Sequence, residues 1–128
     1  MPRVMQDDTT RLRYSDADLE EFRGLITEKL ERARGDLDFY RDSIVEMADD
    51  PDSKVKGLDD GSATAEVQRL QGLVNRTQRH IAHLENALQR IDAKNYGVCR
   101  QTGELIPKAR LRAVPHATLS VEAKMSRN

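Results

Sequence analysis

The stretch VQRLQGLVNRTQRHIAHLENALQRI, residues 67–91, decides the fold. Apolar or small residues recur along it in steps of three and four, at Val67, Leu70, Val74, Thr77, Ile81, Leu84, Leu88 and Ile91. This spacing draws one stripe down an α-helix. The helix should begin after Ser62, a residue type that caps helix N-termini. Its other positions are mostly polar or charged, so the helix needs a partner to bury its stripe.

An earlier part of the chain carries a second stripe of the same kind. Its members are Leu19, Phe22, Ile26, Leu30, Ala33, Leu37, Tyr40, Ile44 and Met47. Ser15, followed by the acids Asp16 and Asp18, marks the start of this helix. Pro51 marks its end, because proline disfavours helix in the residue before it. Each helix should therefore run for about 30 residues, or roughly 45 Å.

A polar loop at residues 49–61 joins the two stripes. Two narrow stripes of equal length most simply bury each other in an antiparallel coiled-coil hairpin, although the same spacing also permits pairing between two chains. The expected fold class is therefore mainly all-α, a long antiparallel coiled-coil hairpin with a small C-terminal module. We expect a flexible tail at 1–14, the hairpin at 15–95 with its tip loop at 49–61, and the module at 96–128, which ends in a helix.

The composition limits the class of protein. Charged residues make up 34% of the 128 residues and aromatic residues 4%, which is too polar for a large globular core. A net charge of −1 argues against a general nucleic-acid binder. The one cysteine excludes a disulfide framework and suits a reducing cytoplasm, and no apolar run resembles a membrane span or a signal peptide. We find no nucleophile pair, phosphate loop or acid–base pair, so we do not expect an enzyme.

Cys99 begins a segment that resembles the first knuckle of a zinc ribbon, Cys-x-x-Cys-Gly, with Thr102 in place of the second cysteine. Residues 119–124 have the spacing of a second knuckle, with Ser120 and Ala123 where the sulfur ligands would be. Tetrahedral zinc needs four ligands, mainly thiolate or imidazole. We therefore expect a zinc-ribbon-like module that lacks its ligands and holds no zinc. The alternative is a lone structural cysteine in an ordinary turn.

The C-terminal module has few apolar residues of its own. Pro107 can open a short helix and Pro115 can end it. Without metal, such a small core should depend on packing against the base of the hairpin. The candidate core residues are Tyr96, Val98, Leu105, Ile106, Leu111, Val114, Leu119 and Val121.

Charge is spread unevenly along the chain. Residues 94–128 hold seven Lys or Arg and two Glu, a net of +5, whereas residues 46–60 hold six acids and two lysines, a net of −4. This predicts a hairpin with an acidic tip and a basic module. The alternative is that the loop is acidic simply because loops are polar.

Residues 96–119, YGVCRQTGELIPKARLRAVPHATL, resemble the finger segment of the DksA/TraR family, especially its Bacteroidetes-type forms with a degraded cysteine set. Residues 13–22, RYSDADLEEF, are similar to the start of those forms. The resemblance covers roughly residues 13–125. It implies a monomeric bacterial transcription regulator that binds RNA polymerase, binds no DNA itself, and acts in the stringent response, often with the alarmone ppGpp.

The resemblance also implies a mode of action. Family members insert the coiled coil into the secondary channel of RNA polymerase, so that acidic residues at the tip approach the catalytic centre. The family tip is usually Asp-x-x-Asp-x-Ala. The nearest matches are Asp49-x-x-Asp52-x-Lys54 and the run at 59–63, in which the two acids are adjacent. Asp59, Asp60 and Asp52 are therefore the implied partner-binding residues.

The family's ppGpp-binding positions, counted from Cys99, fall at His83, Val114 and Lys124, and of these only Lys124 carries a permanent charge. A guanosine polyphosphate needs several cations. Further candidate contacts for ppGpp or polymerase are Lys108, Arg110 and Arg112, if they share a face. Two other functions stay open: a coiled-coil adaptor or dimeric scaffold, and a nucleic-acid-binding relic of a zinc ribbon.

Overall fold

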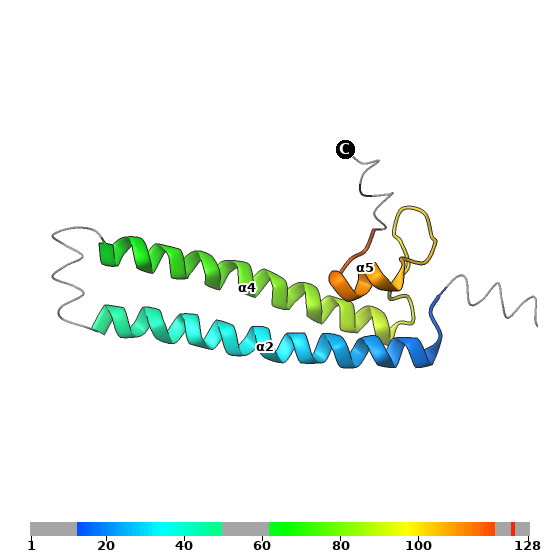
Figure 1. Ribbon diagram of the computed structural model, residues 1–128, viewed down its shortest axis with the longest axis horizontal. Helices are drawn as coiled ribbons and strands as arrows, with labels where there is room; N and C mark the ends of the chain where they lie inside the picture. Colours follow the sequence, from blue (N-terminus) through cyan, green and yellow to red (C-terminus); the bar gives the residue numbers. More distant parts are fainter. Residues whose placement is uncertain (1–12, 50–61, 120–123, 125–128) are drawn as a thin grey trace, which may run out of the picture. The chain divides into compact units, whose positions relative to one another are not determined.

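The computed structural model describes residues 13–49, 62–119 and 124, without the side chains of 62 and 63. Its helices are α2 (Asp16–Asp49), α4 (Ser62–Asp92) and α5 (Lys108–Ala113) (Figure 1). The described residues form no strand, and their β-structure is one antiparallel bridge between Val98 and Leu105. The predicted mainly helical fold is therefore confirmed.

Contacts divide the chain into two compact units. The base unit contains residues 13–29, at the start of α2, and the described residues from 83 onward. The two-helix unit contains residues 30–49 of α2 and 62–82 of α4. Within each unit a part of α2 runs antiparallel to a part of α4 (Figure 1), as a coiled-coil hairpin requires. The division into domains at 15–95 and 96–128 stays a prediction.

Helix α2 begins where the sequence predicted. The Ser15 hydroxyl oxygen accepts a hydrogen bond from the backbone N–H of Asp18 at 3.2 Å, and the Ser15 carbonyl accepts one from Leu19 at 2.9 Å. The bond to the Ser15 hydroxyl satisfies one of the backbone N–H groups that a helix start leaves unpaired, and the bond to the Ser15 carbonyl is the first backbone hydrogen bond of the helix.

Burial follows the predicted stripes. The buried members are Leu19, Phe22, Ile26, Leu84, Ala87 and Ile91 in the base unit, and Leu30, Ala33, Leu37, Leu70 and Val74 in the two-helix unit. The predicted members Tyr40, Ile44, Met47, Val67, Thr77, Ile81 and Leu88 are half-buried. Ala87 was not predicted, because the larger Leu88 beside it fits the same spacing. The core of each unit therefore lies where the stripes of α2 and α4 meet.

The C-terminal module has the short helix that its prolines predicted. Pro107 stands directly before α5, where a missing N–H costs little, and Val114 ends the helix with a hydrogen bond to the Arg110 carbonyl at 2.7 Å. The buried residues of this part are Tyr96, Gly97, Cys99, Ile106, Leu111, Pro115 and Ala117. The predicted core members Val98, Leu105, Val114 and Leu119 are half-buried, and Val121 lies outside the described residues.

Three aromatic rings lie at the centre of the base unit. The ring centroids of Tyr14 and Phe22 are 5.9 Å apart, and those of Phe22 and Tyr96 are 5.4 Å apart. The Tyr14 hydroxyl donates to the carbonyl of Ile106, and the Tyr96 hydroxyl donates to the carbonyl of Pro115 at 2.8 Å. Both hydroxyls thereby anchor segments that flank α5.

Tyr14 corrects one sequence prediction. The residue was assigned to a flexible tail at 1–14, yet it is buried against Phe22. Burial of a large apolar ring is favourable when its hydroxyl is hydrogen-bonded. The sequence prediction missed this because the residues around Tyr14 are mostly charged or polar. Residues 1–12 of that tail lie outside the described residues.

Gly97 makes room for the Tyr14 ring. Its φ of +78° lies in the left-handed region that side chains rarely adopt. A Cβ at this position would also lie 2.7 Å from Cε2 of Tyr14. Both the turn after α4 and the close approach of the ring therefore require glycine.

The packing of the two-helix unit leads to the first prediction. Leu70→Asp would place an unpaired carboxylate at a buried position, and we expect it to lower the free energy of unfolding by about 3 kcal/mol or more. Gln68→Asp, at an exposed position two residues earlier in α4, is the matched control and should change it by less than about 0.5 kcal/mol. Thermal melting followed by circular dichroism measures both, and equal melting temperatures for the two variants would show that the stripe is not packed.

The two tyrosines predict a loss of stability in alkali. Burial raises the pKa of Tyr96 and of Tyr14 above the ordinary value of 10.0. In the unfolded chain these hydroxyls ionise near pH 10, so above that pH the unfolded chain releases protons that the folded chain retains. The stability that the two buried hydroxyls contribute is therefore fully present below about pH 10. The free energy of unfolding falls as the pH rises further.

Urea unfolding at about pH 8 and about pH 11 tests this effect. Tyr96→Phe should be less stable at the lower pH by about 1–2 kcal/mol, because the Pro115 carbonyl loses its donor. The same variant should lose less stability than the wild type between the two pH values. An equal loss in both proteins would contradict the assignment to Tyr96.

Candidate functional site

The knuckle predicted around Cys99 is a tight turn closed by backbone hydrogen bonds. Cys99 donates to the carbonyl of Glu104 at 2.8 Å, and Gly103 donates to the carbonyl of Cys99 at 2.9 Å. Ile106 donates to the carbonyl of Gly97 at 2.7 Å. Gly103 has a φ of +77°, which the turn needs between its two sides. Residues 97–106 thus form a closed turn at the place where the sequence predicted the first knuckle.

A second contact connects this turn to the segment after α5. The backbone N–H of Arg100 donates to the carbonyl of Thr118 at 2.8 Å. In a zinc ribbon the metal connects its two knuckles through four protein ligands. Here a backbone hydrogen bond joins the first knuckle to the segment that leads to the second.

The residues of the turn do not fit a zinc ion. The Cys99 side chain is buried. Thr102 is exposed, and its hydroxyl oxygen accepts a hydrogen bond from the backbone N–H of Glu104 at 3.2 Å. Among the described residues, no three His, Cys, Asp or Glu side chains gather into a possible metal site. Ser120 and Ala123 lie outside the described residues, and alanine has no ligand atom.

The three cations of α5 do not share one face. Lys108 and Arg112 are one turn apart, and both contact acids of α2: Lys108 Nζ lies 2.9 Å from Asp18, and an Arg112 guanidinium nitrogen 3.3 Å from Glu21. Arg110 points elsewhere, because its Nε donates to the carbonyl of Leu119 at 2.9 Å. A ligand on one side of α5 can therefore meet Lys108 and Arg112 together, without Arg110.

The acids paired with α5 were not recognised as site residues in the sequence. Lys108 also lies 6.0 Å from the centre of the Tyr14 ring. The hydrogen bond from Lys108 is the largest of the effects that lower the pKa of the Asp18 carboxyl below its ordinary value of 3.8. The acids of the first turn had only been interpreted as favourable charges at a helix N-terminus. Their further role, pairing with cations 90 residues away in the chain, has no signal in local spacing.

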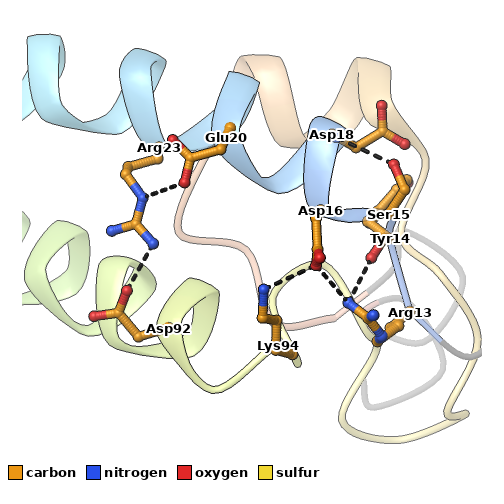
Figure 2. Close-up of polar contacts among 9 residues, drawn as sticks. All are labelled: Arg13, Tyr14, Ser15, Asp16, Asp18, Glu20, Arg23, Asp92 and Lys94. Carbon is orange, nitrogen blue, oxygen red and sulfur yellow. Dashed lines mark hydrogen bonds and ion pairs between the residues drawn. The ribbon is translucent and has the colours of Figure 1, made fainter.

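More ion pairs surround the start of α2 (Figure 2). One Asp16 carboxylate oxygen lies 2.8 Å from Lys94 Nζ and 3.2 Å from an Arg13 nitrogen. The hydrogen bond from Lys94 is the main cause that lowers the pKa of Asp16. Figure 2 also shows Arg23 between two acids, Glu20 at 3.0 Å and Asp92 at 2.7 Å. These pairs join the first turns of α2 to the end of α4.

The positions that family spacing assigned to ppGpp differ in their surroundings. The ring of His83 is stacked on that of His116, with centroids 5.2 Å apart. Val114 is half-buried and Lys124 is exposed. Arg90, which the sequence did not single out, donates to the carbonyl of His116 at 3.3 Å. The histidine at this position therefore serves a packing contact between α4 and the segment after α5.

The predicted tip residues Asp52, Asp59 and Asp60 lie outside the described residues. Their roles stay predictions. No helix in the described part of the chain is both long and apolar enough to cross a membrane.

Residues 94–128 match the family described as "Prokaryotic dksA/traR C4-type zinc finger". A stretch of 50 residues is 46% identical to the RNA polymerase-binding transcription factor DksA of Caulobacter vibrioides, and covers 39% of this chain and 35% of that protein. A stretch of 44 residues is 46% identical to General stress protein 16O of Bacillus subtilis, and covers 34% of this chain and 27% of that protein. The matches thus span about a third of these relatives' length.

The likeness in structure extends over most of the chain. The fold is similar to that of transcription factor DksA2 from Pseudomonas aeruginosa, with a TM-score of 0.79 and 26% sequence identity. The superposition covers 87% of this chain and 83% of the DksA2 chain. The finger match and the shared fold agree with the resemblance seen in residues 96–119. Together these findings support the assignment of this chain to the DksA/TraR family, with a finger segment that retains one cysteine.

Proposed function

We propose that this chain is a transcription regulator that binds RNA polymerase, inserts its coiled-coil hairpin into the secondary channel, and modulates initiation without being an enzyme. The observation that carries the proposal is the similarity to DksA2 over 87% of the chain. The name of the Caulobacter relative, an RNA polymerase-binding transcription factor, points the same way. A two-helix hairpin with about 30 residues on each side would extend roughly 45 Å, a length suited to carrying a tip into a narrow channel.

The base unit supplies the charges for a polymerase contact in this proposal. Lys108, Arg112 and Lys124 offer cations on or after α5. Such charges at the rim of an interface mainly speed and orient association with an acidic partner. Arg110 is already held by the Leu119 carbonyl, so its part would be to position that segment. We place the protein in the cytoplasm with its polymerase, as a monomer.

The proposal includes ppGpp as an effector. Lys108 and Arg112 share one side of α5, and both are exposed enough to exchange partners: 41% and 56% of their side-chain surfaces are open to solvent. Exposed ion pairs contribute only about 0–1 kcal/mol, so a polyphosphate can replace Asp18 and Glu21 at these cations. The stronger charge of a polyphosphate favours that exchange.

We also propose that the finger works without zinc. The turn at 97–106 is closed by its own backbone hydrogen bonds, and its residue types supply one thiolate where zinc needs four ligands. We expect less than 0.1 equivalent of zinc, taking roughly a tenth of a site as background, and an unchanged melting temperature with a chelator, because a structural zinc contributes on the order of 10 kcal/mol. Metal analysis and thermal melting measure both. One tightly bound equivalent of zinc would contradict the proposal.

A gain-of-function variant controls this experiment. Replacing Thr102, Ser120 and Ala123 together with cysteine would restore a four-thiolate set with Cys99. This variant should bind one zinc and melt at a lower temperature when a chelator is added. If it binds no zinc, the assignment of the four positions is wrong, whatever the wild type does.

The tip prediction separates binding from regulation. Asp59 and Asp60 stand between Gly57 and Gly61, outside both apolar stripes, so Asn at both positions should leave folding unchanged. Affinity should come from the broad surfaces of the helices and the module, where more area is buried. The carboxylates would act near the catalytic magnesium, where charge shifts the population of active-site conformations. We therefore expect near-normal polymerase binding and loss of the effect on transcription.

Two measurements on core polymerase and a responsive promoter decide the tip prediction. Competition binding gives the affinity, and initiation in vitro gives the regulatory effect. If the wild type fails to bind polymerase, the proposed function is wrong. If Asp59→Asn with Asp60→Asn still regulates like the wild type, the tip acids have no role, although the protein can still be a polymerase regulator.

A further inference from the structure

Phe39 is exposed on α2 in the two-helix unit. The residue keeps 66% of its surface open to solvent, and Val45 keeps 57%. The aromatic neighbour that Phe39 contacts is Tyr40, with ring centroids 6.0 Å apart. A single exposed aliphatic side chain is ordinary on a protein surface, whereas aromatic residues, Phe included, are enriched at protein interfaces. The residues around the ring decide whether Phe39 is an ordinary exposed side chain or part of an interface.

Gly35 lies one turn before Phe39, on the same face of α2, since residues four apart are neighbours on a helix. A glycine inside a helix lowers its stability by about 1 kcal/mol relative to alanine. No packing among the residues that the structure describes requires this glycine, because a Cβ added there would meet none of their atoms within 4 Å. Bare backbone beside an exposed ring leaves space into which an atom of another molecule can fit.

Acids outnumber basic residues around Phe39, although Arg32, seven residues before it, is also exposed on this side of α2. Asp36 and Asp42 are three residues before and after Phe39, and Glu46 is seven residues after it, so all three flank the ring on its own face. All three are exposed. We call Gly35, Asp36, Phe39, Asp42 and Glu46 the Phe39 face. Its acids exclude a nucleic acid as the occupant and favour a basic protein surface.

We propose that the Phe39 face docks on a basic surface of RNA polymerase that receives the Phe39 ring in an apolar pocket. The ring anchors the contact, the bare backbone at Gly35 allows close approach, and the three acids pair with cations around the pocket. This inference rests on the proposed function, since it names a contact surface of the same complex. A second copy of this chain is a poor occupant, because two such faces would bring their acids together.

Glycine substitutions give the sharpest test. Gly35→Ala should raise the melting temperature of the isolated protein, since its Cβ meets nothing, yet weaken binding to core polymerase by about tenfold. Gly72→Ala is the matched control, an exposed glycine inside α4 whose added Cβ also meets nothing. It should raise the melting temperature similarly and leave binding unchanged. A structural role for Gly35 alone could not produce this difference.

Phe39→Ala is the second arm of the test. It should weaken polymerase binding by about tenfold or more without changing the melting temperature, because the ring is mostly exposed. Competition binding to core polymerase at low and high salt measures all variants, and the wild type should lose affinity as salt screens the acids. Sedimentation of the free protein is run in parallel.

The outcomes separate the two proposals. If wild-type protein does not bind polymerase, the proposed function fails. If wild-type protein binds and both Gly35→Ala and Phe39→Ala bind as tightly, the Phe39 face is not a contact and the proposed function stands. A wild-type dimer that Phe39→Ala converts to a monomer would also overturn the inference, because the occupant would then be a second copy.

Discussion

The base unit depends on one buried contact, the hydroxyl of Tyr14 donating to the carbonyl of Ile106. It joins the residues just before α2 to the segment that leads into α5, which are separated by 92 positions in the chain. The contact exists because Gly97 leaves room for the ring and Phe22 packs against it. A buried carbonyl without its donor costs about 1–3 kcal/mol, so the ring, the glycine and the hydrogen bond depend on one another.

The same arrangement explains how a small C-terminal module can keep a defined conformation. The module has few buried residues, and a core of that size seldom stabilises a folded structure by itself. Tyr96 extends the aromatic cluster into the module. Its hydroxyl donates to the carbonyl of Pro115, which follows α5 in the chain. The two tyrosine hydroxyls therefore fix both segments that flank α5. The ion pairs of Lys108 and Arg112 with acids of α2 help to orient α5, but they contribute little free energy.

The long helices could be predicted from the sequence because their signal is local. Ser15 caps α2, the stripes repeat every three or four residues, and the residues of the stripes are buried or half-buried. The short helix after Pro107 followed from the fixed φ and missing N–H of proline. These features need no knowledge of distant contacts. Ala87 escaped prediction because spacing alone cannot choose between adjacent apolar residues when Leu88 is the larger.

The contacts of the site could not be predicted in the same way. Tyr14 seemed part of a polar tail, and its burial depends on Gly97, 83 positions later, which only the fold brings near it. The separation of Arg110 from Lys108 and Arg112 required the bounds of α5 and the path of the segment at Leu119. The expectation that the finger holds no zinc, by contrast, rests on residue types alone, because threonine, serine and alanine cannot replace thiolates wherever they lie.

Charges are used differently in the two units. In the base unit, Asp16, Asp18 and Glu21 each lie against a cation of the same unit, so the charges orient segments within the chain. In the two-helix unit, residues 35–46 carry four acids and one arginine, Arg41. This excess of acids is local to one segment of α2, where like charges three or four residues apart repel each other. Both the repulsion among these acids and the presence of Gly35, which no packing among the described residues requires, are explained if the Phe39 face binds a surface of opposite charge on another protein.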